Sequence, residues 1–285
     1  FWRTHVHAHK PGALYISGQP GTGKTALLTE VVKAMEHGAT AKQPMRKVYL
    51  NCMSLVDPKD VYRRLLDELP ATMLNGISLD DPVQAIRQIV LGERRKTLLV
   101  VILDEIDHLL TKDQSVLYRL FEWAAQSGSR LVLVGIANAL DLTERFLPLL
   151  CAKSCEPQLL NFNPYTVDDI IGILNERLQE AARVDGKEAA EATPPLVQRN
   201  AIELCARKVA SATGDLRKAM DVCRQAIELA EQDYLAKQPA TSPAAPRPSV
   251  TVAHVLKVLS GVFGSASVQV IRTIGFQQKL VLGAF

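Results

Sequence analysis

The segment GQPGTGKT, residues 18–25, constrains the fold of this chain more than any other feature. It matches the spacing G-x-x-x-x-G-K-[ST] and lies between an apolar run, ALYISG, and a helical pattern, TALLTEVVKAM. Glycines at positions 18, 21 and 23 let backbone N–H groups converge on phosphate oxygens, and the N-terminus of the next helix favours the same anion. A glycine turn with an incidental lysine would not need this flanking strand and helix. We therefore interpret the segment as a P-loop that binds ATP with Mg²⁺.

Four apolar runs rich in β-branched residues follow one another between residues 13 and 150. They are ALYISG, KVYLNC, TLLVVILDE and RLVLVGIAN, and the segments between them are long enough for crossover helices. Strands that are apolar along their whole length are typical of a parallel sheet buried on both faces. The pattern predicts an α/β fold with helices on both sides of the sheet.

Two carboxylates follow the apolar residues VVIL at the end of the third run, as in a Walker B motif. We expect Asp104 to hold Mg²⁺ through water and Glu105 to polarise the attacking water, with Lys24 on the β- and γ-phosphates and Thr25 on the metal. The alternative is an acidic pair that faces solvent at a strand end. With a P-loop upstream, the sequence favours an ATPase over a protein that only binds nucleotide.

Two further polar residues are candidates for contact with the γ-phosphate. Asn138 follows the fourth run, although an asparagine after a strand is more often a turn or helix cap. Arg217 lies near the start of a helical segment, SATGDLRKAMDVC, although an arginine there is more often solvated on a helix face.

The character of the chain changes after residue 163, which sets the predicted domain boundaries. Residues 1–163 form the α/β domain, and residues 164–236 form a helical domain that starts at a cap made by Thr166 and Asp169. Residues 237–249 contain four prolines and predict a linker. Residues 250–285 are helical in pattern and predict the beginning of a third domain that the chain does not complete.

Composition excludes several classes of protein. Hydrophobic residues make up 47% and charged residues 22%, as in folded globular domains, and no apolar run is long enough to cross a membrane. The five cysteines are scattered and do not form a zinc-ligand set. The net charge is only +3, so contact with nucleic acid must come from a local patch.

The phrases GQPGTGKT, VVILDEID, LVLVGIAN and GDLRKAMDVCR together resemble AAA+ ATPases of the initiator clade. LNCMSL, VLYRLFEW, GIANALDLTERFLP, PQLLNFNPYT and RKAMDVCRQAIE resemble the cell division control protein 6 family of eukaryotic replication-licensing factors, over roughly residues 11–235. The resemblance implies an AAA+ parallel sheet, an all-α lid and the start of a winged-helix domain, in a chain truncated at both ends.

The same resemblance implies a function and partners. Family members act in the nucleus, join the origin recognition complex on double-stranded DNA and help to load the minichromosome-maintenance helicase with its loading chaperone. It implies a slow, Mg²⁺-dependent ATPase that its partners stimulate. Alternatives are a scaffold of the origin complex that binds ATP with little hydrolysis, and a clamp-loader-like remodeller that forms homomeric rings.

The resemblance also assigns roles to individual residues. Asn138 becomes sensor 1, Arg217 becomes sensor 2, and Tyr165 and Ile173 become lid residues near the adenine. The P-loop contacts are Gly18, Gln19, Pro20, Gly21, Thr22, Gly23, Lys24, Thr25 and Ala26.

The chain departs from the family where an arginine finger is usual. Leu149 stands at that position, and Arg145 is a substitute candidate that can also be a solvated residue.

An inserted helical element of this clade contacts DNA, and DPKDVYRRLLDELPATMLNG, residues 57–76, occupies its place. Arg63 and Arg64 are therefore candidate DNA contacts, and so is the run ERRK at residues 93–96, although exposed basic residues usually serve solubility. Ser242 before Pro243 resembles a proline-directed phosphorylation site.

Overall fold

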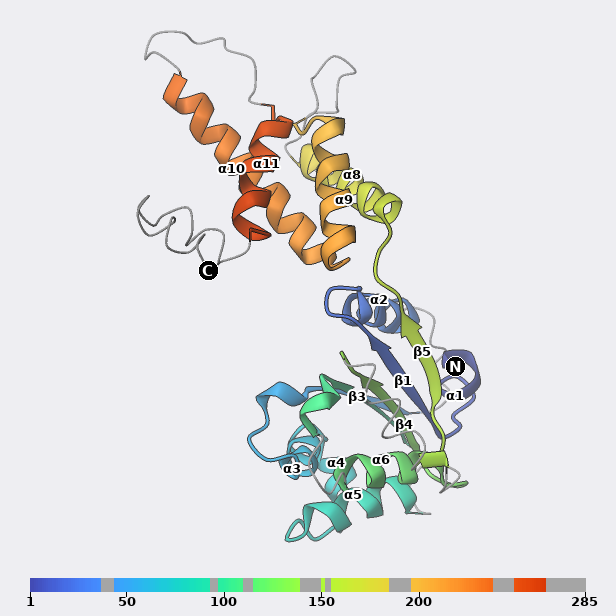
Figure 1. Ribbon diagram of the computed structural model, residues 1–285. Helices are drawn as coiled ribbons and strands as arrows, with labels where there is room; N and C mark the ends of the chain where they lie inside the picture. Colours follow the sequence, from blue (N-terminus) through green and yellow to red (C-terminus); the bar gives the residue numbers. More distant parts are fainter. Residues whose placement is uncertain are drawn as a thin grey trace, which may run out of the picture. The chain divides into compact units, whose positions relative to one another are not determined.

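The structure is a computed structural model that describes residues 1–36, 44–92, 97–109, 115–138, 150–151, 155–184, 196–237 and 249–264 (Figure 1). The chain divides into two compact units, Phe1–Asn163 and Pro164–Phe285. Each unit has a hydrophobic core of its own. The first is an α/β unit and the second is helical.

The α/β unit is built on a parallel sheet of five strands. These are β1 (Gly12–Gly18), β2 (Met45–Asn51), β3 (Leu98–Asp104), β4 (Leu131–Ile136) and β5 (Gln158–Phe162), in the spatial order β2-β3-β4-β1-β5. All four neighbouring pairs are parallel, so the carboxyl ends of the strands lie at one edge. The four strands predicted from apolar runs are confirmed.

Burial on both faces explains why the central strands read as continuous apolar runs. All seven residues of β3 are buried, and the first six alternate between two cores. Leu99, Val101 and Leu103 belong to one core, and Leu98, Val100 and Ile102 belong to the other. A strand that alternated apolar and polar residues would place polar side chains in one of these two cores.

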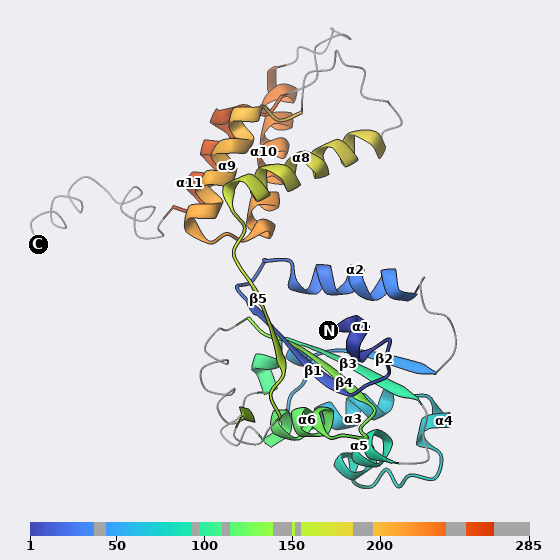
Figure 2. The ribbon, with the colours of Figure 1, turned by 90° about the vertical axis from the view of Figure 1, so that its right-hand side faces the viewer.

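Helices cover each face of the sheet (Figure 2). On one side α3 (Asp60–Asp67), α5 (Pro82–Leu91) and α6 (Ser115–Ala125) supply buried residues to the larger core, near the short α4 (Ala71–Leu74). On the other side lie α1 (Trp2–His5) and α2 (Lys24–Glu36), where Trp2, Val6 and Leu28 join the smaller core. Two 3₁₀ turns, Cys52–Ser54 and Ile106–Leu109, follow β2 and β3 directly.

Strand β5 is not among the strands predicted from the sequence, because its residues QLLNF lack a buried pattern. It lies at the edge of the sheet and pairs only with β1 among the described strands. Leu159 is 45% exposed and Leu160 is 43% exposed. An edge strand with one neighbour gives a weaker signal than a strand covered on both faces.

The helical unit contains α8 (Val167–Val184), α9 (Arg199–Ala212), α10 (Leu216–Lys237) and α11 (Val252–Val262) among its described residues. The predicted cap at the start of α8 is confirmed: Thr166 Oγ1 donates to Asp169 Oδ2 at 2.7 Å, and Asp169 N donates back to Thr166 Oγ1 at 3.3 Å. The hydrogen bonds that the Asp169 carboxylate accepts from Oγ1 and from the backbone N of Thr166 lower the pKa of Asp169. Gly214, with φ +61°, separates α9 from α10.

Helix α11 packs into the core of the helical unit rather than forming a core of its own. Val255, Val258 and Leu259 are buried among residues of α8, α9 and α10. Residues 238–248 of the predicted linker and residues 265–285 lie outside the described residues, so a separate third domain stays a prediction. Among the described residues, the structure contains no helix with the length and apolarity needed to cross a membrane.

Candidate functional site

The loop between β1 and α2 has the backbone that the P-loop spacing predicts. β1 ends at Gly18 and α2 begins at Lys24. Gly21 has φ +77° and Gly23 has φ +82°, left-handed angles that glycine adopts without strain. The loop therefore leads a buried strand directly into the N-terminus of a 13-residue helix, an arrangement that favours bound phosphate.

Gly18 is required for a different reason, which is close packing. A Cβ atom at this position would lie 2.5 Å from the backbone oxygen of Phe162 and 2.8 Å from its Cβ. Phe162 is the register partner of Gly18 in the pairing of β1 with β5. On the same pair of strands, Ser17 Oγ donates a short hydrogen bond to Asn161 Oδ1. The first glycine of the motif thus fixes where the loop leaves the sheet.

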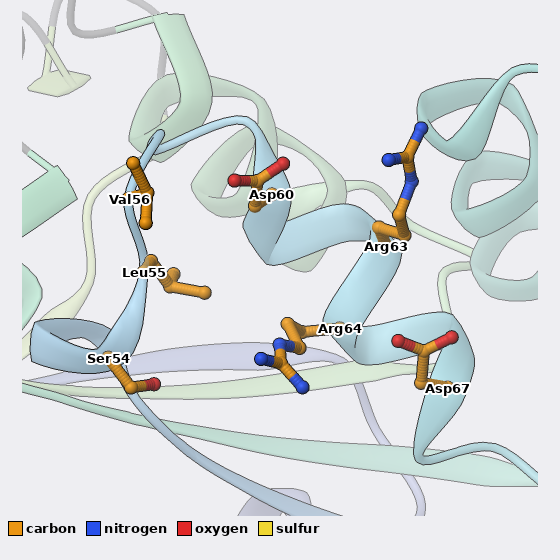
Figure 3. Close-up of a pocket in the computed structure, with 7 residues that line it drawn as sticks. All are labelled: Ser54, Leu55, Val56, Asp60, Arg63, Arg64 and Asp67. Atoms are coloured by element: carbon orange, nitrogen blue, oxygen red, sulfur yellow. The ribbon is translucent and has the colours of Figure 1, made fainter.

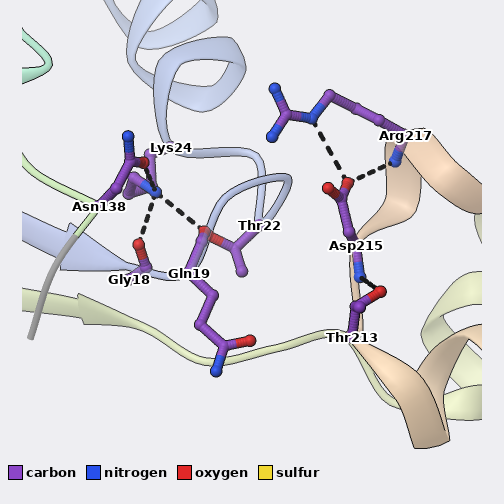
Figure 4. Close-up of polar contacts among 8 residues, drawn as sticks. All are labelled: Gly18, Gln19, Thr22, Lys24, Asn138, Thr213, Asp215 and Arg217. Carbon is purple, nitrogen blue, oxygen red and sulfur yellow. Dashed lines mark hydrogen bonds and ion pairs between the residues drawn. The ribbon is translucent and has the colours of Figure 1, made fainter.

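The ammonium of Lys24 is buried, and its position is fixed by hydrogen bonds. Lys24 is 6% exposed, and its Nζ donates to Gly18 O at 2.7 Å, Gln19 O at 2.9 Å and Asn138 Oδ1 at 3.0 Å (Figure 4). The loop closes on itself through Thr22 Oγ1, which donates to Gln19 O at 2.8 Å. Gln19, Pro20, Thr25 and Ala26 are exposed around this buried charge.

Asp104 is the last residue of β3, and its carboxylate accepts three hydrogen bonds. Oδ2 accepts from Thr25 Oγ1 at 3.0 Å and from Tyr49 OH at 2.6 Å, and Oδ1 accepts from Glu105 N at 3.0 Å. Asp104 is only 6% exposed. The structure thus brings together Thr25 and Asp104, the two predicted magnesium ligands.

Glu105 turns away from the strand direction, with a left-handed φ of +57°. Its Oε2 accepts a short hydrogen bond from Asn138 Nδ2. Asn138 therefore bridges the carboxylate of Glu105 and the ammonium of Lys24, while its own N donates to Asp107 Oδ2 at 2.7 Å. The candidate base, the candidate sensor and the P-loop lysine form one continuous chain of hydrogen bonds.

Sequence reasoning gave no role to Tyr49 or to Asp107, which support this site, although Asp107 is the last residue of the phrase VVILDEID. Tyr49 lies on β2, where the parallel register pairs Asn51 with Asp104 and Tyr49 with Ile102. Burial, and then the hydrogen bond to Asp104, raise the pKa of Tyr49, so its hydroxyl is a donor at neutral pH. Cys52, next to the site, is fully buried, and burial together with nearby carboxylates raises its pKa to about 12.

The remaining predicted nucleotide contacts lie in the helical unit. Arg217 is exposed, its N donates to Asp215 Oδ1 at 2.9 Å, and its Nε lies 3.4 Å from the same oxygen (Figure 4). Tyr165 is partly buried against the helical core, and Ile173 is partly exposed on α8. Their roles toward the nucleotide stay predictions.

The candidate DNA contacts lie on α3, beside a cavity of about 280 Å³ (Figure 3). Arg64 extends toward the segment that follows β2, whereas Arg63 extends in a different direction. The cavity is also lined by two aspartates, Asp60 and Asp67, which balance the two arginines. The element is helical as predicted, but the contact of these arginines with DNA stays a prediction.

Several predicted features lie outside the described residues: Arg145, Leu149, Ser242 and the run at residues 93–96. Among the described residues, no group of three or more histidine, cysteine or acidic side chains could by itself hold a metal ion. The five cysteines, which lie in the described part of the chain, are all free thiols.

Comparison with known families agrees with the geometry of both units. Residues 7–143 match the AAA domain, and residues 187–245 match the AAA lid domain. The first match includes the P-loop and the Walker B strand, and the second includes α9 and α10.

Individual relatives match almost the whole chain. Cell division control protein 18 of Schizosaccharomyces pombe is 39% identical over 309 residues, which cover 99% of this chain and 52% of that protein. The cell division control protein 6 homolog of Homo sapiens is 38% identical over 276 residues, which cover 93% and 46%. The chain thus spans about half the length of these curated relatives.

A solved structure also resembles this chain over its whole length. A chain in the structure of Drosophila ORC bound to DNA superposes with a TM-score of 0.76 at 29% identity, covering 100% of this chain and 64% of that one. The likeness therefore extends over both units of the fold.

Proposed function

Since the chain belongs to the AAA family, among the relatives of cell division control proteins 6 and 18, we propose that it is an ATP-dependent factor in the initiation of DNA replication. In this proposal it acts in the nucleus and binds the origin recognition complex on double-stranded DNA. There it promotes loading of the minichromosome-maintenance helicase with its loading chaperone. The likeness to a chain of DNA-bound Drosophila ORC supports the first of these partners.

The observation that carries the proposal is the chain of hydrogen bonds from Lys24 through Asn138 to Glu105. Three motifs that are distant in sequence meet at the carboxyl edge of the sheet, where open α/β sheets bind their ligands. Lys24 binds the β- and γ-phosphates, Glu105 orients the attacking water, and Asn138 fixes the position of one relative to the other.

The residues at this edge fit a magnesium ion. Thr25 Oγ1 and Asp104 Oδ2 lie 3.0 Å apart, and hydroxyl and carboxylate oxygens are the ligands that Mg²⁺ prefers. Thr25 would hold the ion through its hydroxyl oxygen, and Asp104 would hold it through water. When bound, the ion would neutralise charge on the β- and γ-phosphates.

The test compares two substitutions that separate binding from hydrolysis. Lys24→Ala removes the buried ammonium, so we expect loss of ATP binding and of ATP-dependent recruitment to the origin recognition complex on DNA. Glu105→Gln keeps the shape of the side chain, so we expect ATP binding and recruitment to persist while turnover stops. Undiminished turnover by purified Glu105→Gln protein would contradict the role given to this carboxylate.

A second candidate is an origin-complex scaffold that binds ATP with little hydrolysis. Leu149, where relatives of this type usually carry the arginine finger, favours it. For the ATP-dependent replication factor we expect slow hydrolysis that partner and DNA stimulate, whereas the scaffold would hydrolyse little ATP in either condition. Steady-state turnover measured with and without partner and DNA decides between these two candidates. A stable homohexamer in ATP, seen by light scattering, would instead support a ring-forming remodeller.

A further inference from the structure

Tyr49 makes the shortest of the three hydrogen bonds to Asp104. Its hydroxyl donates to Oδ2 at 2.6 Å, against 3.0 Å for the hydroxyl of Thr25 on the same oxygen. Tyr49 comes from β2, the edge strand beside β3, and Thr25 comes from the first turn of α2. The two donors therefore approach one carboxylate oxygen from different elements.

The hydroxyls of Thr25 and Tyr49 have different roles when nucleotide binds. In the proposed function a lone pair of the Thr25 hydroxyl binds Mg²⁺ while its proton donates to Asp104, so the position of this hydroxyl depends on the metal as well as on the carboxylate. The backbone N of Glu105 holds Oδ1 but leaves Oδ2 free to rotate out of position. Of the two side chains among the described residues that donate to Oδ2, Tyr49 is the one that does not also bind the metal.

Packing alone does not explain a tyrosine at this position. Val48 and Leu50 on either side are buried, whereas Tyr49 is 50% exposed. A hydroxyl at such a position could be satisfied by water, and phenylalanine would cover the sheet equally well. The hydroxyl is instead directed at the buried carboxylate that the Walker B motif supplies.

We propose that Tyr49 is a positioning residue that holds the carboxylate of Asp104 in the orientation that Mg²⁺ requires. The inference rests on the proposed function, because it assigns Tyr49 a role toward the metal of that site. Groups that hydrogen-bond to a metal-binding carboxylate commonly change metal affinity by about 10- to 100-fold when they are removed. For a ligand that acts through water, we expect the lower end of that range.

The test is Tyr49→Phe in the whole chain, read by binding of a fluorescent, non-hydrolysable ATP analogue. We expect its affinity to fall about 10-fold in Mg²⁺ and to change less than about 2-fold in excess EDTA. The Mg²⁺ concentration at half-maximal binding should rise by a similar factor, and high Mg²⁺ should restore the affinity. A tyrosine with only a structural role would lower binding equally in Mg²⁺ and in EDTA.

Tyr62→Phe is the matched control. Tyr62 is buried on α3, and its hydroxyl donates to Val116 O at 3.4 Å. Losing that hydroxyl removes a hydrogen bond in the same unit without touching Asp104. We expect Tyr62→Phe to bind the analogue like the natural chain in both buffers.

A double-mutant cycle with Asp104→Asn connects the effect to the carboxylate. Asp104→Asn should remove most of the Mg²⁺-dependent affinity, and adding Tyr49→Phe to it should change little more. If Tyr49→Phe loses the same affinity in the Asp104→Asn background, or none in either background, the positioning role is wrong. If Asp104→Asn itself keeps full Mg²⁺-dependent binding, the metal site of the proposed function is wrong.

Discussion

Replacing Gly18 by alanine tests whether the exit of the P-loop from the sheet depends on close packing. The new Cβ would lie 2.5 Å from Phe162 O and 2.8 Å from Phe162 Cβ, both closer than a Cβ approaches other atoms in folded proteins. Neither atom is the end of a flexible side chain. The clash can be relieved only if β1 and β5 move apart at the register pair Gly18 and Phe162.

The expected cost has two parts. A non-glycine residue at φ +154° costs about 1–3 kcal/mol in backbone strain, and an overpacked contact that moves backbone costs about 1–3 kcal/mol. We therefore expect Gly18→Ala to lower the free energy of unfolding by about 2–6 kcal/mol. The carbonyl of Gly18 also accepts from Lys24 Nζ, so ATP affinity should fall as well.

Gly76→Ala is the matched control, because Gly76 has φ +78° but no atom lies within 4 Å of the position that a new Cβ would take. It should cost only the strain of a left-handed angle, about 1–2 kcal/mol, and leave ATP affinity unchanged. Urea denaturation followed by tryptophan fluorescence measures both variants, since Trp2 and Trp123 both lie in the α/β unit. Equal losses for the two variants would refute the packing argument.

Two further predictions concern polar groups of the site. Asn138→Asp replaces the amide that donates to Glu105 with a second carboxylate, so we expect the free energy of unfolding to fall by about 2–3 kcal/mol and turnover to fall by about 100-fold; wild-type turnover would contradict the bridging role. Because the pKa of Cys52 is raised to about 12 in the folded state, the folded chain keeps this proton while the unfolded chain loses it above pH of about 9. Cys52 alone should therefore lower the free energy of unfolding by about 1.4 kcal/mol per pH unit from about pH 9 to pH 12, and Cys52→Ala should reduce the slope in urea titrations by about that amount while the buried tyrosines keep their own contribution.

The sequence predicts an element of the fold where its residues share one environment, such as burial along a whole strand. The run LLVVIL before Asp104 is apolar throughout because β3 is covered on both faces, and that pattern has few other physical causes. The cap formed by Thr166 and Asp169 was predictable because its partners are three residues apart. Strand β5 was not, because its exposed leucines resemble those of any surface segment.

The candidate site divides in the same way. Lys24 could be named in advance from the P-loop spacing, and Asp104 and Asn138 because each lies at or just after a strand end in a parallel sheet, where strand ends meet at one edge. Tyr49 lies outside the motifs and Asp107 has no assigned part in them, so their roles follow only from contacts with those residues. No spacing within β2 indicates that a tyrosine two residues before its end touches a carboxylate of β3.

That contact depends on register, which a local pattern does not specify. Parallel pairing sets Asn51 opposite Asp104, and only then does the tyrosine two residues earlier come within reach of the Asp104 carboxylate. A shift of one residue would turn Tyr49 to the other face of the sheet, while the apolar runs would look almost the same. The motifs therefore determine which groups meet the nucleotide, whereas the residues that hold those groups in place are determined by the pairing of the strands.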